Sequence, residues 1–348
     1  MTTRRKLLGA AGAAAIVALS ATSAFAENVT LKLHQFLPAQ ANVPKLILDV
    51  WADKVEAASG GEITIDRFPS MQLGGKPPEL MDQAIDGVAD IVWTVVAYTP
   101  GRYPSTEVFE LPFMMTNARA TSHAYWEMFE KHMKDTEFKD IKILGTWVHG
   151  PGIIHTSDPV ETPADLQGMK IRGGGRSVNS LLTQLGATPV GMPVPAIPEG
   201  LSKGVIDGTT IPWEVTAALK VPELVENHTE FTGKALYTLT FVLAMNKEKY
   251  ESLSDAQKAA IDENSGLEFS VFAGGTMADS DDPSREAALD NGNNVITLDA
   301  DQTAEWRELA QPVYDKWLAD MTEKGIDGQA LLDEATYLIE KYTPQYVK

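Results

Sequence analysis

Cysteine is absent from this chain of 348 residues, and basic residues are scarce. Without cysteine there is no disulfide, no thiolate metal site, no iron–sulfur cluster and no cysteine nucleophile. The 29 lysines and arginines are outnumbered by 48 aspartates and glutamates, and the formal net charge of −19 repels nucleic acid. The fold therefore depends on hydrophobic cores, and any anionic ligand has to be held by local positive groups.

The motifs of common enzyme classes are also missing. The six histidines do not occur in an H-E-x-x-H motif or at any other close spacing typical of metal ligands. No G-x-S-x-G elbow, Walker loop or G-x-G-x-x-G follows a predicted strand, so hydrolases, NTPases and dinucleotide enzymes lack their usual signatures. We therefore expect no metal, no cofactor and no catalysis. An exported enzyme is the weaker alternative, which observed turnover would support.

The first 26 residues are typical of an export signal. Arg4, Arg5 and Lys6 precede an apolar run, and small residues before Glu27 suggest cleavage after Ala26 and a periplasmic product, by the Sec or the twin-arginine route. No later run reaches the roughly 18 apolar residues of a membrane span; an uncleaved anchor is the alternative. The remaining chain of about 320 residues exceeds one core and predicts two domains.

Two stretches show the same order of strand, helix, strand, helix and strand. The first has predicted strands at 29–33, 63–68 and 89–96 with helices at 43–58 and 77–85, and the second has strands at 169–172, 188–192 and 205–211 with helices at 177–185 and 198–203. This order predicts two α/β lobes, each with a mainly parallel sheet flanked by helices. A Gly-Val-x-Asp step recurs at 87–90 and 204–207. A strand at 236–245 and helices within 254–277, 300–324 and 328–342 are expected to return across both lobes.

Arg172 ends an apolar strand and is followed by three glycines. Its guanidinium presents a rigid fork of donors that matches a carboxylate, and glycines let the backbone turn sharply beside it. A surface arginine beside a flexible turn is the competing interpretation. Ligands of open α/β sheets gather beyond the carboxyl ends of the strands. These ends offer an apolar and aromatic set around one cation: Phe36, Trp93, Tyr98, Met192, Val194, Ile211, Trp213 and Glu214. His149 lies near the predicted lobe boundary.

Seven motifs in order resemble the solute-binding proteins of tripartite ATP-independent periplasmic (TRAP) transporters, of the dicarboxylate-binding DctP type. The motifs are L-K-L-H-Q-F at 31–36, F-P-S-M-Q-L-G-G at 68–75, E-L-P-F-M at 110–114, D-L-Q-G-M-K-I-R at 165–172, L-G-A-T-P-V at 185–190, G-V-I-D-G at 204–208 and A-M-N-K-E-K-Y at 244–250. The resemblance implies a two-lobed periplasmic binding protein that closes on an organic anion, with a long helix bracing both lobes. It implies lobes of 27–150 plus 237–280 and of 151–236 plus 281–348. Arg172 falls on the family's signature arginine, which pairs with the ligand carboxylate. The implied partners are the small and large permease subunits, and a monomer is expected.

The sequence differs from the sugar-acid-binding members of this family at positions that contact the ligand, and these differences indicate which ligand to expect. Apolar residues at Phe36, Val95, Ile153 and Ile211 replace polar groups that include a second arginine. Because burying an unpaired hydroxyl costs about 1 to 3 kcal/mol, a polyol acid is disfavoured. We expect a small monocarboxylate with an apolar or aromatic body.

Other ligands and roles remain open. A zwitterion of the ectoine or betaine type would place its cation near aromatic faces and Glu214, and a dicarboxylate or sugar acid is a further alternative, as is a sensor role. Arg176 could supply a second cation, but its place in the following helix suggests that it faces solvent.

Overall fold

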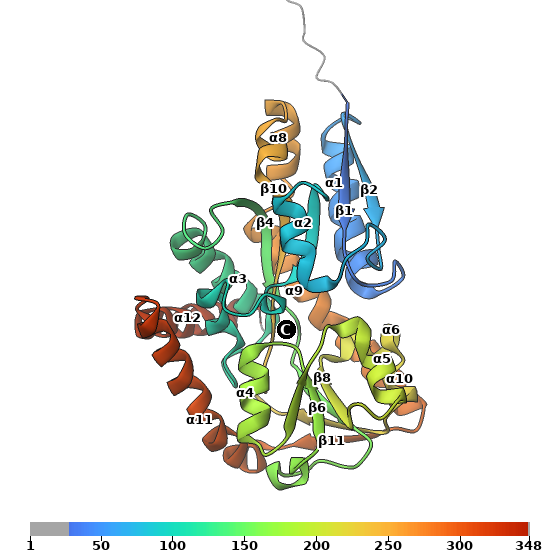
Figure 1. Ribbon diagram of the computed structural model, residues 1–348, viewed down its shortest axis with the longest axis vertical. Coiled ribbons are helices and arrows are strands. Elements are labelled where there is room, and N and C mark those ends of the chain that lie inside the picture. The colour runs from blue at the N-terminus through green and yellow to red at the C-terminus, as the bar shows by residue number, and fades with distance from the viewer. Residues whose placement is uncertain (1–27, 347–348) are drawn as a thin grey trace, which may run out of the picture.

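The chain forms two α/β lobes, one above the other in Figure 1. The computed structural model describes residues 28–346, so the predicted export signal and its cleavage site lie outside the described residues. The first sheet contains β1 (Val29–His34), β2 (Ile63–Phe68), β3 (Ile91–Val95), β4 (Ile141–Val148) and β10 (Thr240–Asn246). The second contains β5 (Ile153–Thr156), β6 (Lys170–Gly173), β7 (Thr188–Gly191), β8 (Gly208–Ile211), β9 (Asn227–Phe231) and β11 (Asn294–Leu298).

Both predicted repeats of strand and helix are confirmed. The first sheet has the order β2-β1-β3-β10-β4, and the second has β11-β9-β5-β8-β6-β7. The runs β2-β1-β3 and β7-β6-β8 are parallel and equivalent, with Leu33 opposite Ile91 in one and Ile171 opposite Gly208 in the other. In each lobe one strand that enters from the other lobe, β10 or β5, runs antiparallel to its neighbours.

The repeated Gly-Val-x-Asp step occupies the same place in both lobes. The Asp90 carboxylate accepts a hydrogen bond from the Lys32 N–H at 2.8 Å, and the Asp207 carboxylate accepts one from the Lys170 N–H at 2.8 Å. Each aspartate thereby fixes the start of the third strand of its unit to the first. The two lobes thus share this aspartate hydrogen bond as well as the same strand topology.

The helices cover both sheets. They are α1 (Asp49–Ala58), α2 (Leu80–Ile85), α3 (Ala118–Met128), α4 (Arg176–Gln184), α5 (Ile197–Ser202), α6 (Thr216–Leu219), α7 (Lys247–Glu251), α8 (Asp255–Asp262), α9 (Leu267–Asp279), α10 (Asp281–Asp290), α11 (Ala300–Glu323) and α12 (Gly328–Tyr342). The predicted helical run at 254–277 is divided between α8 and α9, because Gly266 adopts φ +85° before α9. The predicted helix at 43–58 begins with a π turn at Pro44–Leu48.

Two helical segments join the lobes. Helix α9 packs on α3 and β4 of the first lobe, and α10, which follows after Ser280 alone, packs on the second lobe beside Trp213–Val215. Farther on, α11 packs on α4 and α12 packs on α3, so the end of the chain runs from the lower to the upper lobe in Figure 1. These contacts agree with the expected brace.

The chain crosses between the lobes at 149–152, at 232–239 and at Ser280, and the three crossings meet. The Gly152 N–H donates to the Tyr237 carbonyl at 2.9 Å. The Asp281 carboxyl lies so close to Gly150 that a Cβ there would be 1.9 Å from its Oδ2 atom. We call this meeting of 149–152, 237–239 and 280–281 the hinge ribbon. It lies between the two sheets.

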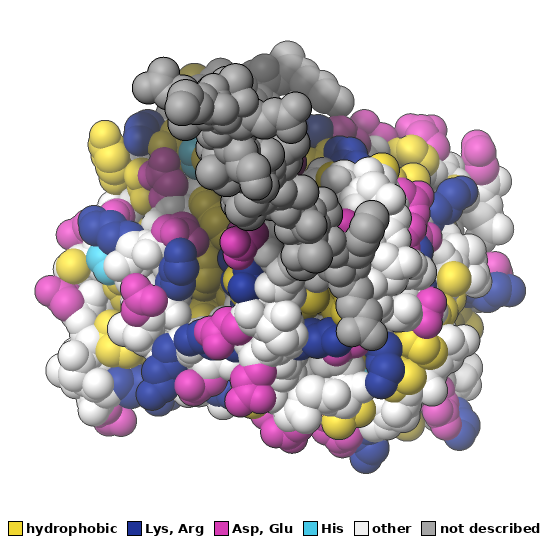
Figure 2. Space-filling view, turned by 90° about the horizontal axis from the view of Figure 1, so that it is seen from above, with side chains coloured by type: hydrophobic (Ala, Val, Ile, Leu, Met, Phe, Trp, Pro, Cys, Tyr) yellow, Lys and Arg dark blue, Asp and Glu magenta, His cyan; other side chains and the backbone are white. Residues whose placement is uncertain are grey.

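Charged side chains of both signs are interspersed on the end of the molecule shown in Figure 2. Charged side chains of the first lobe also form local ion pairs, such as Arg67 with Glu56 at 3.0 Å. Within residues 28–346, no helix combines the length and the apolar character needed to cross a membrane.

Candidate ligand-binding cleft

A cavity with an empty volume of about 380 Å³, including its opening, lies between the lobes at the hinge ribbon. Most of the residues predicted for ligand binding line it: Phe36, Trp93, His149, Arg172, Val194, Ile211 and Glu214. The other lining residues are Leu37, Val95, Pro212, Val215, Tyr237, Leu239, Phe241 and Met277. Both lobes and the hinge contribute, and nearly all the side chains are apolar or aromatic.

Arg172 is the cation of this cavity, and its side chain is completely buried. Its Nε donates to the Met192 carbonyl and its Nη1 to the Thr210 carbonyl, both at 2.9 Å. The Nη2 atom has no hydrogen-bond partner among the described residues. Because a buried charge costs several kcal/mol unless it is paired, this geometry favours an anion that completes the site.

The three glycines after Arg172 allow close approach, and the chain bends at Gly174 and Gly175 as it passes from β6 into α4. None of them has positive φ. A Cβ on Gly174 would lie 3.1 Å from Nη2 and 3.2 Å from Nη1 of Arg172, and 2.6 Å from a methyl group of Leu239. The backbone therefore packs against the guanidinium face, and the absence of a side chain fixes the position of the charge.

We expect Gly174→Ala to weaken ligand binding roughly tenfold while the protein still folds. The added methyl group must displace Leu239 or the guanidinium, and overpacking of this kind costs about 1 to 3 kcal/mol. Isothermal titration of the variant against the wild type measures the effect. Gly191→Ala is the matched control, because its Cβ would meet its nearest neighbour at an ordinary 3.4 Å. Equal losses in both variants would contradict the packing role of Gly174.

Part of the cavity wall is a stack of aromatic rings. The Phe36 and Trp93 rings are stacked with centroids 4.5 Å apart, and Trp93 and Phe241 are stacked at 5.5 Å. Trp147 continues the stack behind Phe241 at 6.2 Å. Such rings present a flat, rigid apolar surface, which suits a planar ligand.

Two tyrosine hydroxyls lie near the guanidinium. The Tyr98 hydroxyl accepts a hydrogen bond from the Val194 N–H at 2.9 Å, which joins the two lobes, and Tyr98 packs beside Phe36. The Tyr237 hydroxyl is buried without a partner among the described residues. Burial raises the pKa of Tyr237 to about 12, although the charge of Arg172 acts in the opposite direction. Tyr237 therefore stays protonated and can donate to an anion beside Arg172.

His149 lines the cavity but has both ring nitrogens engaged. Its Nδ1 lies 2.5 Å from the Gly150 carbonyl, and its Nε2 accepts from the Leu239 N–H at 3.1 Å. Burial lowers the pKa of His149 to about 4, so the ring is neutral. It holds the hinge ribbon together and offers the cavity only its edge.

Four predicted residues do not line the cavity: Tyr98, Ile153, Met192 and Trp213. The chain enters a 3₁₀ turn at Trp213–Val215, which rotates Trp213 away from the cavity and Glu214 toward it. Trp213 instead packs with Ile153 and Ala288, and its N–H donates to Glu230 at 3.2 Å. Met192 contributes its carbonyl to Arg172.

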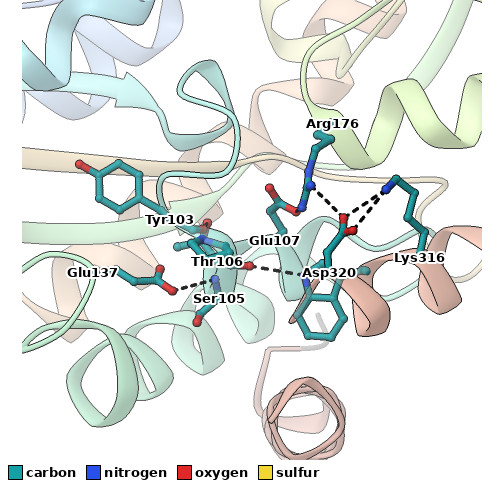
Figure 3. A network of polar contacts seen from close by, with 10 residues as sticks. Tyr103, Ser105, Thr106, Glu107, Glu137, Arg176, Lys316 and Asp320 are labelled. Carbon is teal, nitrogen blue, oxygen red and sulfur yellow. Dashed lines mark hydrogen bonds and ion pairs between the residues drawn. The ribbon is translucent and has the colours of Figure 1, made fainter. Parts of the chain in front are cut away.

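Arg176 is neither a ligand-facing cation nor a free solvent-facing one. Its guanidinium bonds Glu107 at 2.6 Å and Asp320 at 2.8 Å, and Lys316 also contacts Asp320 (Figure 3). Glu107 belongs to the segment before α3, whereas Arg176 begins α4 of the second lobe. This ion pair and the Tyr98 contact hold the lobes in a closed arrangement.

Sequence reasoning missed the residues just before and at the beginning of β10. Tyr237, Leu239 and Phe241 line the cavity because β10 is antiparallel, so its beginning reaches the cleft where parallel strands end. The rule that ligands lie beyond carboxyl ends could not find them. Tyr237, Leu239 and Phe241 alternate with Thr238 and Thr240 at the beginning of the predicted strand, and this alternation was the available signal.

Two of the larger hollows lie on the first lobe, around Arg67 and around Tyr250, with empty volumes of about 710 and 990 Å³. Basic groups in both are paired with carboxylates, as Arg67 is with Asp53 and Lys142 is with Asp262. Neither hollow therefore shows the unmatched buried charge of the cleft. No cluster of three potential metal-ligating side chains occurs within residues 28–346.

Two hinged α/β lobes that enclose an arginine in an apolar cavity define a ligand-closing binding protein. The chain belongs to the bacterial extracellular solute-binding protein family 7, DctP, whose model matches residues 36–320. This confirms the family that the sequence motifs suggested. The family is one of transport proteins that bind solutes outside the cytoplasm.

Solved structures of similar proteins support the same fold. A TRAP solute-binding protein of Rhodoferax ferrireducens T118, in complex with copurified benzoate, is 49% identical with a TM-score of 0.90, and the match covers 92% of this chain and 100% of that one. A marine metagenome protein specific for aromatic acids, with 3-hydroxybenzoate, is 46% identical with a TM-score of 0.89 and coverage of 91% and 99%. A Bordetella bronchiseptica protein with bound (R)- and (S)-mandelate is 30% identical with a TM-score of 0.83 and coverage of 90% and 99%.

Proposed function

We propose that this protein captures an aromatic monocarboxylate in the periplasm and delivers it to the membrane subunits of a TRAP transporter, without chemical turnover. The observation that carries the proposal is the buried Arg172, whose Nη2 atom is free in a cavity walled by stacked aromatic rings. The benzoate and 3-hydroxybenzoate complexes of similar proteins support the same ligand class. Cleavage after Ala26 and a monomeric state belong to this proposal.

The roles of the residues follow from their positions. Arg172 and the Tyr237 hydroxyl hold the carboxylate, while Phe36 and Trp93 contact the ring. The lobes are assigned as 27–150 plus 237–280 and 151–236 plus 281–348. They close when Tyr98 reaches Val194 and Arg176 reaches Glu107.

A thermal-shift panel tests the ligand class. Benzoate or a simple derivative at about 100 times its dissociation constant adds roughly 2.7 kcal/mol of stability, equivalent to an increase in Tm of roughly 5 °C or more. Glucuronate represents the polyol acids and ectoine the zwitterions in this panel. Native mass spectrometry of the purified protein identifies any copurified ligand. Stabilisation by glucuronate or ectoine with silence from the aromatic acids would exclude the proposal.

A further inference from the structure

Two buried carboxyl groups meet where the cavity reaches the hinge ribbon. Glu214 lines the cavity with only 3% of its surface exposed, and Asp281, the first residue of α10, is 8% exposed. The Glu214 N–H donates to the Asp281 Oδ1 atom at 2.8 Å. This places an acidic group in a cavity that is otherwise apolar apart from Arg172, His149 and Tyr237.

Contacts from both lobes and the hinge hold Glu214 in place. Asn42 of the first lobe donates from Nδ2 to the Glu214 carbonyl at 2.8 Å. Asp281, which fixes the Glu214 backbone, is itself seated against Gly150. The Glu214 backbone is therefore fixed in the closed arrangement, and it carries the side chain at the cavity wall, where a recognition group must be placed.

The surroundings of Glu214 and Asp281 favour the protonated, neutral form of both carboxyl groups. Burial raises the pKa of Glu214 to about 8, and the neighbouring charge of Asp281 raises it further, against a lowering by Asn42. Burial likewise raises the pKa of Asp281 to about 8. A protonated carboxyl both donates and accepts hydrogen bonds, as a hydroxyl group does. The pair therefore matches a neutral hydroxyl better than a second carboxylate.

A second observation shows that the same cavity is built for a ligand. The Nη2 atom of Arg172 is buried and unpartnered in it, and Ile211 and Pro212, which precede Glu214, also line it. Arg172 lies on β6 and Glu214 follows β8, the neighbouring strand. A single ring can then meet a cationic group and a carboxyl group from adjacent strands.

We propose that Glu214, positioned by Asp281 and Asn42, is the specificity-determining residue that recognises a hydroxyl substituent on the ring of an aromatic carboxylate bound by Arg172. This inference rests on the function proposed above and adds the hydroxyl to the ligand. Under this proposal, the protein binds aromatic acids with a hydroxyl substituent more tightly than benzoate. The ring of benzoate has no polar group that could pair with Glu214.

Isothermal titration at pH 6.5 tests the proposal with benzoate, 3-hydroxybenzoate, 4-hydroxybenzoate and 4-(aminomethyl)benzoate. The wild type is expected to bind the better hydroxybenzoate about tenfold or more tightly than benzoate. In Glu214→Met, which keeps the bulk and removes the polar atoms, this ratio falls to about one, because the affinity for the hydroxybenzoates falls more than the affinity for benzoate. Glu214→Gln, which can still donate and accept, keeps part of the preference. Glu110→Gln, a buried glutamate that does not line the cavity, leaves the ratio unchanged.

Several results would overturn the role of Glu214. These are a hydroxyl preference that survives in Glu214→Met, equal wild-type affinities for benzoate and both hydroxybenzoates, and tightest binding of the aminomethyl compound, which would mark a cation site. Failure of the proposed function looks different, because folded wild-type protein would then bind none of the four acids.

Discussion

Arg172→Ala is expected to reduce aromatic-acid affinity by roughly a thousandfold, because truncating one partner of a buried, hydrogen-bonded charge pair costs about 2 to 5 kcal/mol. Arg172→Lys should lose most of this affinity as well. A lysine ammonium cannot bond the Met192 and Thr210 carbonyls in the planar geometry that leaves Nη2 free for the ligand. Isothermal titration of both variants measures the loss.

The stability of the ligand-free protein separates binding from folding in this experiment. Arg172→Ala removes two hydrogen bonds to carbonyls but also removes a buried charge without a counter-ion, so we expect this variant to fold with a Tm close to that of the wild type. Arg285→Ala is the matched control, since it removes a half-buried, paired arginine from the second lobe. Wild-type affinity in Arg172→Lys would show that the fork geometry is not required.

The second large effect is a loss of stability at alkaline pH. Burial raises the pKa of Glu110 to about 8, and the same holds for Glu214 and Asp281. Between the ordinary carboxyl pKa and about 8, the folded protein keeps protons that the unfolded chain has released. Stability therefore falls as the pH rises through this window. For Glu110 alone the loss between pH 6 and pH 8 is about 2 kcal/mol.

Histidines act in the opposite direction in the lower part of this window. Burial lowers the pKa of His149 and of His228 to about 4, so the unfolded chain binds protons below pH 6.5 that the folded protein refuses. This contribution to stability rises with pH up to about 6.5. Between about pH 4.5 and 6.5 the two effects oppose each other, so the net fall in stability is expected to be steepest between pH 6.5 and 8.

Urea denaturation at pH 6 and pH 8 measures the alkaline effect, and Glu110→Gln identifies its source. The Glu110 Oε1 atom accepts from the Thr240 N–H at 3.0 Å and from its hydroxyl, and glutamine preserves that acceptor without a titrating group. The variant should lose about 2 kcal/mol less than the wild type between these pH values. Glu199→Gln, at an exposed position, should behave like the wild type. An unchanged alkaline loss in Glu110→Gln would refute the assignment.

The sequence predicted the repeated lobes well because their strands are apolar runs and their helices begin and end at clear signals. It did not reveal β5 and β9, whose residues include His155, Thr156, Asn227 and His228, since these polar side chains do not follow an alternating pattern. Such strands form because neighbouring strands supply partners, which is a tertiary effect. Pattern alone could therefore locate each lobe's parallel unit but not complete either sheet.

In the site, too, the type of a residue could be predicted to matter, whereas its orientation depends on the path of the backbone. The ligand-binding role of Arg172 could be predicted because a guanidinium at a strand end beside glycines is suited to hold a carboxylate. Arg172 does line the cavity. Trp213 and Glu214 are neighbours in sequence, and a single turn decides which of them faces the cavity. The contribution of Tyr237 required the direction of β10, which no local pattern specifies.

The hinge ribbon also forms the floor of the cavity, since His149 and Tyr237 belong to both. Affinity and the rate of lobe opening are therefore not independent properties of this protein. A substitution on the floor that accommodates a new acid also alters the joint about which the lobes rotate, whereas one at Phe36 or Trp93 leaves that joint intact. New specificities should evolve most readily through the aromatic wall, with release to the transporter preserved.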